Sequence, residues 1–425
     1  MRKGRHLLWV VLIVALAMIG TMFLVACGDD EAATDDEGMS SDEGMTSDEG
    51  DWGEDLVIGA LNSETGVNAL TGEEQKWAQE QAVADINAAG GVMLNDGKQH
   101  KLVLKYADDQ SDPTAGAAAM EKLIKVEGLE IILSSNITPV NEAAAIVAER
   151  EQVYYQINTS WTDFIASHEF EWTSDIFLTP AAAGGVAVQV LELAPDDVQP
   201  TNVAVMVENN PDGQGLGDGA KAALEASGYN VGLYELFTEG TKDFSSIILK
   251  LKQEGIDGLV TLISPSDGIQ FVKQMKEQDW SPKFIFGWKG FWPTSFKNSL
   301  GDDAEGICHD AFWTSTLDAP GAAELGDKFE ADHDGDESVS IGLPYASVQI
   351  LAMAIERAGV FEAAAVRDEV FGGTFDDTVY GTCVYDEAGI CNTPMYGIQW
   401  IGGERVIVAP DVGNTLQLFV PWDER

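Results

Sequence analysis

The sequence predicts an α/β protein made of two doubly wound domains, each a parallel β-sheet with helices on both faces. Short apolar runs rich in β-branched residues alternate with segments of helical periodicity, which is the pattern of β-α-β units. The alternation occurs in two series of similar size, 57–157 and 181–286, and neither is a sequence repeat of the other. A chain of 425 residues is long enough for two or three globular units.

The first series opens with a buried strand at 57–61, followed by a polar loop at 62–70. A helix comes next, in which Thr71 and Glu74 have the spacing of a capping box, and a glycine pair ends it. Because small ligands bind beyond the carboxyl ends of parallel strands, the loop is a candidate piece of a binding site. We expect further strands at 102–106, 130–133 and 153–157, and further helices at 114–125 and 139–150.

The second series follows the same pattern, with a loop expected at 208–217 between a strand and a helix. Its expected strands are 203–207, 231–237, 258–263 and 283–286, and its expected helices are 181–193, 218–227, 244–254 and 267–277. The remaining sequence predicts a helix at 344–357 and strands at 397–400 and 405–409.

Acidic residues dominate the charge of the chain: 71 Asp and Glu stand against 24 Lys and Arg, a formal net charge of −47. Binding to nucleic-acid phosphates or to anionic lipid headgroups needs a basic surface. The balance therefore argues against a nucleic-acid partner and against membrane adhesion by charge.

The first 26 residues have the features of a signal peptide, a basic start followed by an apolar stretch. The sequence LVAC at 24–27 resembles a bacterial lipobox. We expect Cys27 to be lipidated and to become the first mature residue, so that the exported protein is anchored to the membrane and faces the periplasm or the cell exterior. An uncleaved signal anchor is the alternative. Residues 27–55 are acidic and poor in apolar side chains, which predicts a disordered tether.

A long, ordered set of motifs runs through the first series: Thr65-Gly66, Gly72, Asp85-Ile86-Asn87, Gly90-Gly91 and YADDQSDP at 106–113. It resembles the opening of the Leu/Ile/Val-binding family, the type I periplasmic solute-binding proteins of ABC importers, and the resemblance covers nearly everything after residue 55. It implies two lobes joined by a three-strand hinge, 56–179 plus 311–377 and 180–310 plus 378–425. It also implies a small-molecule solute held between the lobes, and an ABC permease in the cytoplasmic membrane as partner.

Side chains that follow successive strands are the candidate ligand contacts. In the first lobe they are Thr65, Ser134, Ser135, Asn136, Ser160, Trp161 and Thr162, and in the second lobe Asp212, Ser264, Asp267, Trp288 and Lys289. Hydroxyl and loop N–H groups suit a small polar ligand such as an amino acid, an amide or a small carboxylate. In family members that bind amino acids, the positions of Ser135, Ser160 and Thr162 hold the carboxylate and the ammonium. Taken singly, each serine or threonine also fits a helix cap or a turn.

The sequence departs from the family at the residue that usually meets the ligand ammonium. Lys289 stands where an acidic residue is expected. Either Asp212 or Asp267 supplies the missing charge, or the ligand lacks an ammonium and Lys289 meets an anionic group. Three tryptophans are either stacking partners for a planar or cationic ligand or ordinary core residues: Trp161, Trp288 and Trp292.

Cys383 and Cys391 flank a strand–turn pattern, VYDEAGI. The ends of a hairpin can lie within disulfide range, and an extracytoplasmic compartment is oxidising, so we predict a Cys383–Cys391 disulfide. Cys308 is expected to be a small buried residue.

Other motifs argue against catalysis and cofactors. The glycine-rich stretch at 213–220 imitates a dinucleotide fingerprint, but the preceding turn is too long. The aspartates at 332, 334 and 336 lack the glycine and glutamate of a calcium loop, and HEFEW at 168–172 lacks the second histidine of a zinc motif. We therefore expect a monomeric solute-binding lipoprotein of an ABC importer, without metal, cofactor or enzymatic activity. A ligand sensor that signals to a membrane receptor is the alternative, and a surface enzyme ranks below it.

Overall fold

The computed structural model describes residues 52–197, 199–410, 416–417 and 421–422. The expected signal peptide, the lipidation site Cys27 and the tether up to residue 51 lie outside these residues. Trp52 already forms a bridge with Gln99, and the N–H of Gly53 donates to the Gln99 carbonyl at 2.8 Å, so ordered structure begins before the expected boundary at 56. None of the helices in the described part of the chain is both long and apolar enough to cross a membrane.

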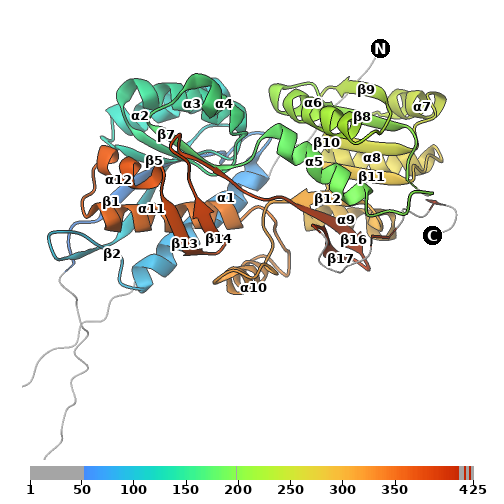
Figure 1. The fold of residues 1–425 in the computed structure, drawn as a ribbon. Helices are drawn as coiled ribbons and strands as arrows, with labels where there is room; N and C mark the ends of the chain where they lie inside the picture. Colours follow the sequence, from blue (N-terminus) through green and yellow to red (C-terminus); the bar gives the residue numbers. More distant parts are fainter. Residues whose placement is uncertain (1–51, 198, 411–415, 418–420, 423–425) are drawn as a thin grey trace, which may run out of the picture. The chain divides into compact units, whose positions relative to one another are not determined.

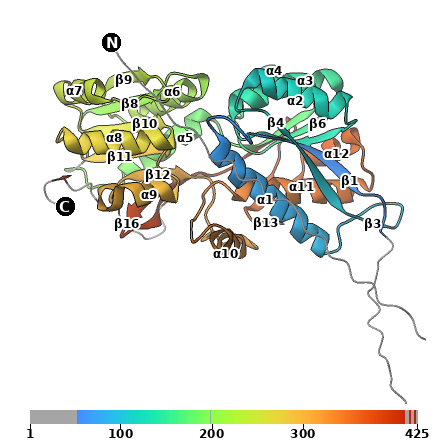
Figure 2. The same ribbon diagram turned by 180° about the vertical axis from the view of Figure 1, so that it is seen from behind.

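The first lobe is built on a six-stranded sheet in which all neighbouring strands are parallel. Helices α2 (Pro113–Lys125) and α3 (Thr138–Glu151) cover one face, and α1 (Ala69–Ala88), α11 (Gly342–Ala358) and α12 (Ala363–Val370) cover the other (Figures 1 and 2). The strand order is β15 (Ile390–Asn392), β7 (Thr173–Phe177), β6 (Tyr154–Ile157), β5 (Ile131–Leu133), β1 (Leu56–Asn62) and β4 (Leu102–Asp108).

The second lobe has a seven-stranded sheet. Its neighbouring strands pair in parallel, except that β16 pairs antiparallel with both β12 and β17. Helices α5 (Pro180–Leu191) and α6 (Pro211–Ala226) pack together, while α7 (Ser245–Gln253), α8 (Pro265–Glu277) and α9 (Thr294–Leu300) cover the opposite face (Figure 2). The order is β17 (Glu404–Ala409), β16 (Tyr396–Ile401), β12 (Cys308–Ala311), β11 (Phe284–Lys289), β10 (Gly258–Ile263), β8 (Val203–Glu208) and β9 (Val231–Phe237).

Strand β8 shows why the central strands read as continuous apolar runs. Val203, Val205 and Val207 belong to the hydrophobic cluster that includes α5 and α6, whereas Ala204 and Met206 belong to the one that includes α7 and α8. Successive side chains of a strand point to opposite faces, so a sheet covered on both sides needs apolar residues at every position. This confirms the doubly wound α/β fold expected from the sequence.

Within residues 52–410 the chain passes between the two sheets three times: after β7, after β12, and between β15 and β16. The expected third boundary, at 378, differs from the structure. β15 pairs in parallel with β7 of the first sheet, with Ile390 opposite Asp175, so the chain leaves the first lobe only after Asn392. The smaller elements are β2 (Val92–Met93), β3 (Gln99–His100), α4 (Asp163–His168), the 3₁₀ helix Gly301–Ala304, α10 (Ala322–Asp332), β13 (Thr374–Thr378) and β14 (Gly381–Val384).

Two local expectations were wrong. Helix α1 begins at Ala69 rather than Thr71, and Glu74 accepts hydrogen bonds from Ser338 and Ser340 instead of closing a capping box. The expected loop at 208–217 is helical from Pro211, with the Asn210 side chain capping the first turn.

The glycines at 213–220, which suggested a loop, lie within α6 and are explained by its packing. A Cβ on Gly219 would lie 2.5 Å from the Pro180 carbonyl oxygen, and a Cβ on Gly217 would lie 2.6 Å from the Tyr234 hydroxyl. They allow α6 to pack closely on α5 and on the sheet. This packing role explains the glycines without a nucleotide.

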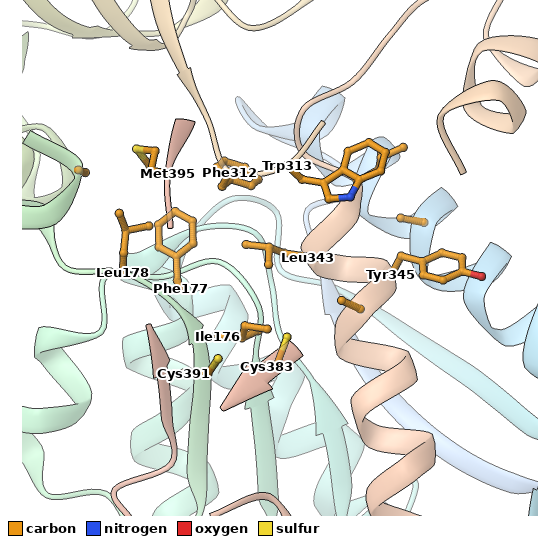
Figure 3. Close-up of a cluster of buried hydrophobic side chains, with 14 of the residues drawn as sticks. Ile176, Phe177, Leu178, Phe312, Trp313, Leu343, Tyr345, Cys383, Cys391 and Met395 are labelled. Atoms are coloured by element: carbon orange, nitrogen blue, oxygen red, sulfur yellow. The ribbon is translucent and has the colours of Figure 1, made fainter. Parts of the chain in front are cut away.

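The cysteine segment also differs from the expected hairpin. β14, which carries Cys383, pairs with β13, and β15, which carries Cys391, pairs with β7. The two side chains lie close together in a buried cluster (Figure 3) and are free thiols, with a hydrogen bond between them that lowers the pKa of Cys383. The structure therefore contains no bond between Cys383 and Cys391, and the disulfide stays a prediction. Cys308 is a buried free thiol.

Candidate functional site

A cavity lies where the carboxyl ends of both sheets meet the three crossings, and its empty volume, counted to the open mouth, is about 780 Å³. The first-lobe wall comprises Asn68, Thr71, Gln75, Asn136, Ile137, Thr138, Thr159 and Trp161. The second-lobe wall comprises Asp212, Leu216, Leu262, Trp288, Lys289, Trp292 and Asp310. Phe177, Phe312 and Met395 of the crossings, with Ser340 and Pro344, complete the lining.

The first-lobe wall holds two amides whose orientation is fixed by their neighbours. Gln75, 1% exposed, donates its Nε2 hydrogens to the Ser134 carbonyl at 2.9 Å and to Asn62 Oδ1 at 3.3 Å, which leaves Oε1 without a partner. Asn136 donates from Nδ2 to the Thr71 hydroxyl at 2.6 Å, and its Oδ1 is unpartnered. Since Thr71 donates its own proton to the Asn68 carbonyl, it must accept from Asn136.

Lys289 ends β11 in the second-lobe wall with a φ of 66°, an uncommon conformation for a side-chain-bearing residue. Its Nζ lies 3.5 Å from Glu208 Oε2 and 4.0 Å from Glu239 Oε1. Burial lowers the pKa of Lys289, but the carboxylates of Glu208, Asp212 and Glu239 outweigh it and raise the pKa above its usual value. Lys289 is therefore a protonated partner of the buried Glu208, whose own pKa is raised by burial.

Two carboxyl groups of the second-lobe wall each accept an indole N–H. Trp161 Nε1 of the first lobe donates to Asp212 Oδ1 at 2.5 Å, a bond that joins the two walls. Trp292 Nε1 donates to Asp310 Oδ1 at 2.5 Å, while Oδ2 of this fully buried residue is unpartnered. Burial raises the pKa of Asp310 to about 8, so its carboxyl group holds a proton at neutral pH, and this proton lies on Oδ2 because Oδ1 accepts the indole N–H.

Aromatic rings form a continuous chain across the crossings. Trp161 packs on Phe177 with ring centroids 5.3 Å apart, Phe177 on Phe312 at 5.4 Å, and Phe312 on Trp292 at 5.3 Å. Figure 3 shows Phe177, Phe312 and Met395 gathered beside the start of α11. The neighbouring ring planes are inclined by 47°, 77° and 88°, so the cavity offers an apolar surface of ring faces and ring edges that spans both lobes.

The structure brings five of the sequence-predicted ligand residues to the cavity lining: Asn136, Trp161, Asp212, Trp288 and Lys289. The other first-lobe candidates face the protein itself. Thr65 donates to Asp108 at 2.7 Å, Ser135 donates to Asp109 at 2.6 Å, and Ser134 accepts from the Asn158 N–H at 3.1 Å.

The remaining candidates also lie outside the lining. Ser160 accepts from Asn141 at 2.8 Å, and Thr162 is buried at the start of α4. In the second lobe, Ser264 precedes the first turn of α8, and the buried Asp267 accepts the Gly240 N–H at 2.7 Å.

Gln75 and Asp310 are cavity residues that the sequence reasoning missed. Gln75 sits between Gly72 and Ala78 on the buried face of α1, so a polar residue on an apolar helix face was the available signal. Asp310 lies in a short buried strand that the periodicity did not reveal.

A family model described as periplasmic binding protein matches residues 55–404. The chain is 28% identical to Leu/Ile/Val-binding protein homolog 3 of Brucella melitensis over 314 residues, which cover 73% of this chain and 83% of the relative. It is 29% identical to homolog 1 of Brucella suis over 304 residues, 70% of this chain and 78% of the relative.

Two solved structures illustrate the shared fold. One is the branched-chain amino acid transporter substrate-binding protein LivJ of Streptococcus pneumoniae with isoleucine, with a TM-score of 0.71 and 19% identity over 83% of this chain and 99% of that one. The other is an ABC transporter solute-binding protein of R. palustris with benzoate, with a TM-score of 0.72 and 16% identity over 86% of this chain and 97% of that one. At these identities the likeness concerns the fold alone.

Proposed function

The chain belongs to the periplasmic binding protein family, and we propose that it is the extracytoplasmic receptor of an ABC importer, which captures a small polar solute by lobe closure. The observation that carries the proposal is a cavity lined by both lobes, with unpartnered buried polar atoms in each wall. The candidate solutes are an amino acid, an amide or a small carboxylate. Such a site binds and orients a solute.

Closure requires contacts that exist only when the two walls meet. The Trp161–Asp212 hydrogen bond joins the walls, and the crossings after β7, β12 and β15 are the segments about which the lobes would rotate. A solute that touches both walls would shift the population toward the closed form, which an ABC permease in the cytoplasmic membrane would then recognise.

Anchoring through Cys27 is part of the proposal and rests on the lipobox-like LVAC sequence. Two acyl chains hold a protein stably at a membrane, and the acidic segment after Cys27 would act as a tether. Cells fed an alkyne-labelled fatty acid should label the wild-type protein and leave Cys27→Ser unlabelled. Equal labelling of both, or labelling of neither, would argue against the anchor.

Solute capture is tested by a thermal-shift screen of amino acids, amides, amines and small carboxylates on the full-length protein. A cognate solute raises the unfolding midpoint because it binds only the folded state. Trp161→Phe, which keeps an aromatic ring but loses the N–H to Asp212, should weaken the binding of that solute several-fold. Trp52→Phe, remote from the cavity, is the matched control. Equal weakening by both variants would mean that the cavity is not the binding site.

A further inference from the structure

Resting on that proposed function, we propose that the preferred solute is an organic amine: a protonated nitrogen with N–H donors on an apolar body, without a carboxylate. Three features of the cavity support this: its two unpartnered amide oxygens, its excess of acidic groups, and its chain of aromatic rings.

Two buried amide oxygens in the described part of the cavity lining have no partner: Gln75 Oε1 and Asn136 Oδ1. The bonds from Gln75 Nε2 to the Ser134 carbonyl and from Asn136 Nδ2 to the Thr71 hydroxyl leave these oxygens facing the cavity. Among the described lining residues, Trp288 Nε1 is an unpartnered donor, and Asp310 Oδ2 is a donor while it carries its proton and an acceptor once that proton is lost. Because a buried polar atom is costly unless it is paired, a solute with N–H donors suits the two amide oxygens.

Two indole N–H groups and the ammonium group of the cavity lining are already engaged. The indole N–H groups of Trp161 and Trp292 donate to Asp212 and Asp310. Lys289 lies between Glu208 and Glu239, and drawing it toward a solute carboxylate would leave Glu208 buried and unpaired. A carboxylate therefore finds no free cation here.

The charge around the cavity favours a cation. Asp212 lines it, and Glu208 and Glu239 stand behind Lys289, so carboxylates outnumber the one ammonium. Asp310 holds a proton at neutral pH, but a nearby ammonium favours its ionised form, which turns Oδ2 from a donor into an acceptor. The rings of Trp161 and Trp292 add cation–π attraction and apolar surface for the body of the solute.

The test is calorimetric titration of the full-length protein with four probes that share one body. 2-Phenylethylamine is the expected binder. 3-Phenylpropanoate lacks the nitrogen, phenylalanine carries both groups, and trimethyl-(2-phenylethyl)ammonium keeps the charge without N–H donors. We expect 2-phenylethylamine to bind at least tenfold more tightly than each of the other three.

Variants locate the effect. Asp212→Asn should weaken 2-phenylethylamine at least tenfold, and Asp218→Asn, exposed on the same helix and outside the lining, should leave it unchanged. If 2-phenylethylamine fails to bind, or binds no better than 3-phenylpropanoate or phenylalanine, the amine inference is overturned. Solute capture itself survives if one of those probes compacts the protein, and fails separately if a bound solute causes no compaction.

Discussion

The two walls of the cavity differ in kind. The first-lobe wall contains no charged residue among those described, and it offers amides, hydroxyls and one indole. The second-lobe wall carries Asp212, Lys289 and Asp310, with Glu208 close behind. The difference suggests that the first lobe selects a solute by hydrogen bonds and shape, while the second lobe selects it by charge.

The largest effect is expected at the ion pair of the second-lobe wall. Lys289→Met leaves the fully buried Glu208 without its cation, and breaking such a pair should lower the free energy of unfolding by about 3 kcal/mol. The double variant Lys289→Met/Glu208→Gln should recover most of this loss, as measured by urea denaturation. No recovery would mean that Lys289 acts through something other than Glu208.

The first-lobe wall should respond through hydrogen bonds alone. Gln75→Leu leaves the Ser134 carbonyl and Asn62 Oδ1 without their shared donor, which should lower the free energy of unfolding by about 2 kcal/mol. Gln81→Leu on the same helix loses a bond to Asp85 near the surface and should cost below about 0.5 kcal/mol. Similar losses in the two variants would contradict the buried role of Gln75.

Ser135, which the sequence predicted to bind the solute, distinguishes a structural role from a binding role. Ser135 donates to Asp109, a buried carboxyl group that also accepts from Ser63 and from the Ser111 N–H. Ser135→Ala should lower the free energy of unfolding by about 1 kcal/mol and leave solute affinity unchanged. A loss of solute affinity without a loss of stability would mean that Ser135 belongs to the binding site.

The smallest expected effect is the release of a fraction of a proton when the solute binds. Burial raises the pKa of Asp310 to about 8, so most molecules carry this proton at pH 7, and a bound ammonium should release it. Titrations of 2-phenylethylamine at pH 7 in buffers of different ionisation enthalpy would measure the release. Asp310→Asn should abolish it, and an unchanged release in that variant would assign the proton to another group.

The sequence revealed strands and helices better than it revealed which side chains face the cavity. The runs at 231–237 and 258–263 are β9 and β10 as expected. All residues of β10 are buried, because the sheet is covered on both faces at this strand. Position after a strand was also informative for Trp161, Asp212 and Lys289.

Strand-end position alone could not show where a hydroxyl group points. Ser135 and Ser160 follow strands β5 and β6 but bond to Asp109 and Asn141, which local spacing does not relate to them. The third crossing was expected too early in the chain, at 378, for a similar reason: β15 is three residues long and is defined by its pairing with β7 rather than by its own pattern.

Small-angle X-ray scattering of the full-length protein, with and without a saturating solute from the thermal-shift screen, tests lobe closure most directly. The two-lobed cavity predicts a smaller radius of gyration in the bound state, and Trp161→Phe should need more solute to reach it. A bound solute that leaves the radius of gyration unchanged would contradict capture by closure.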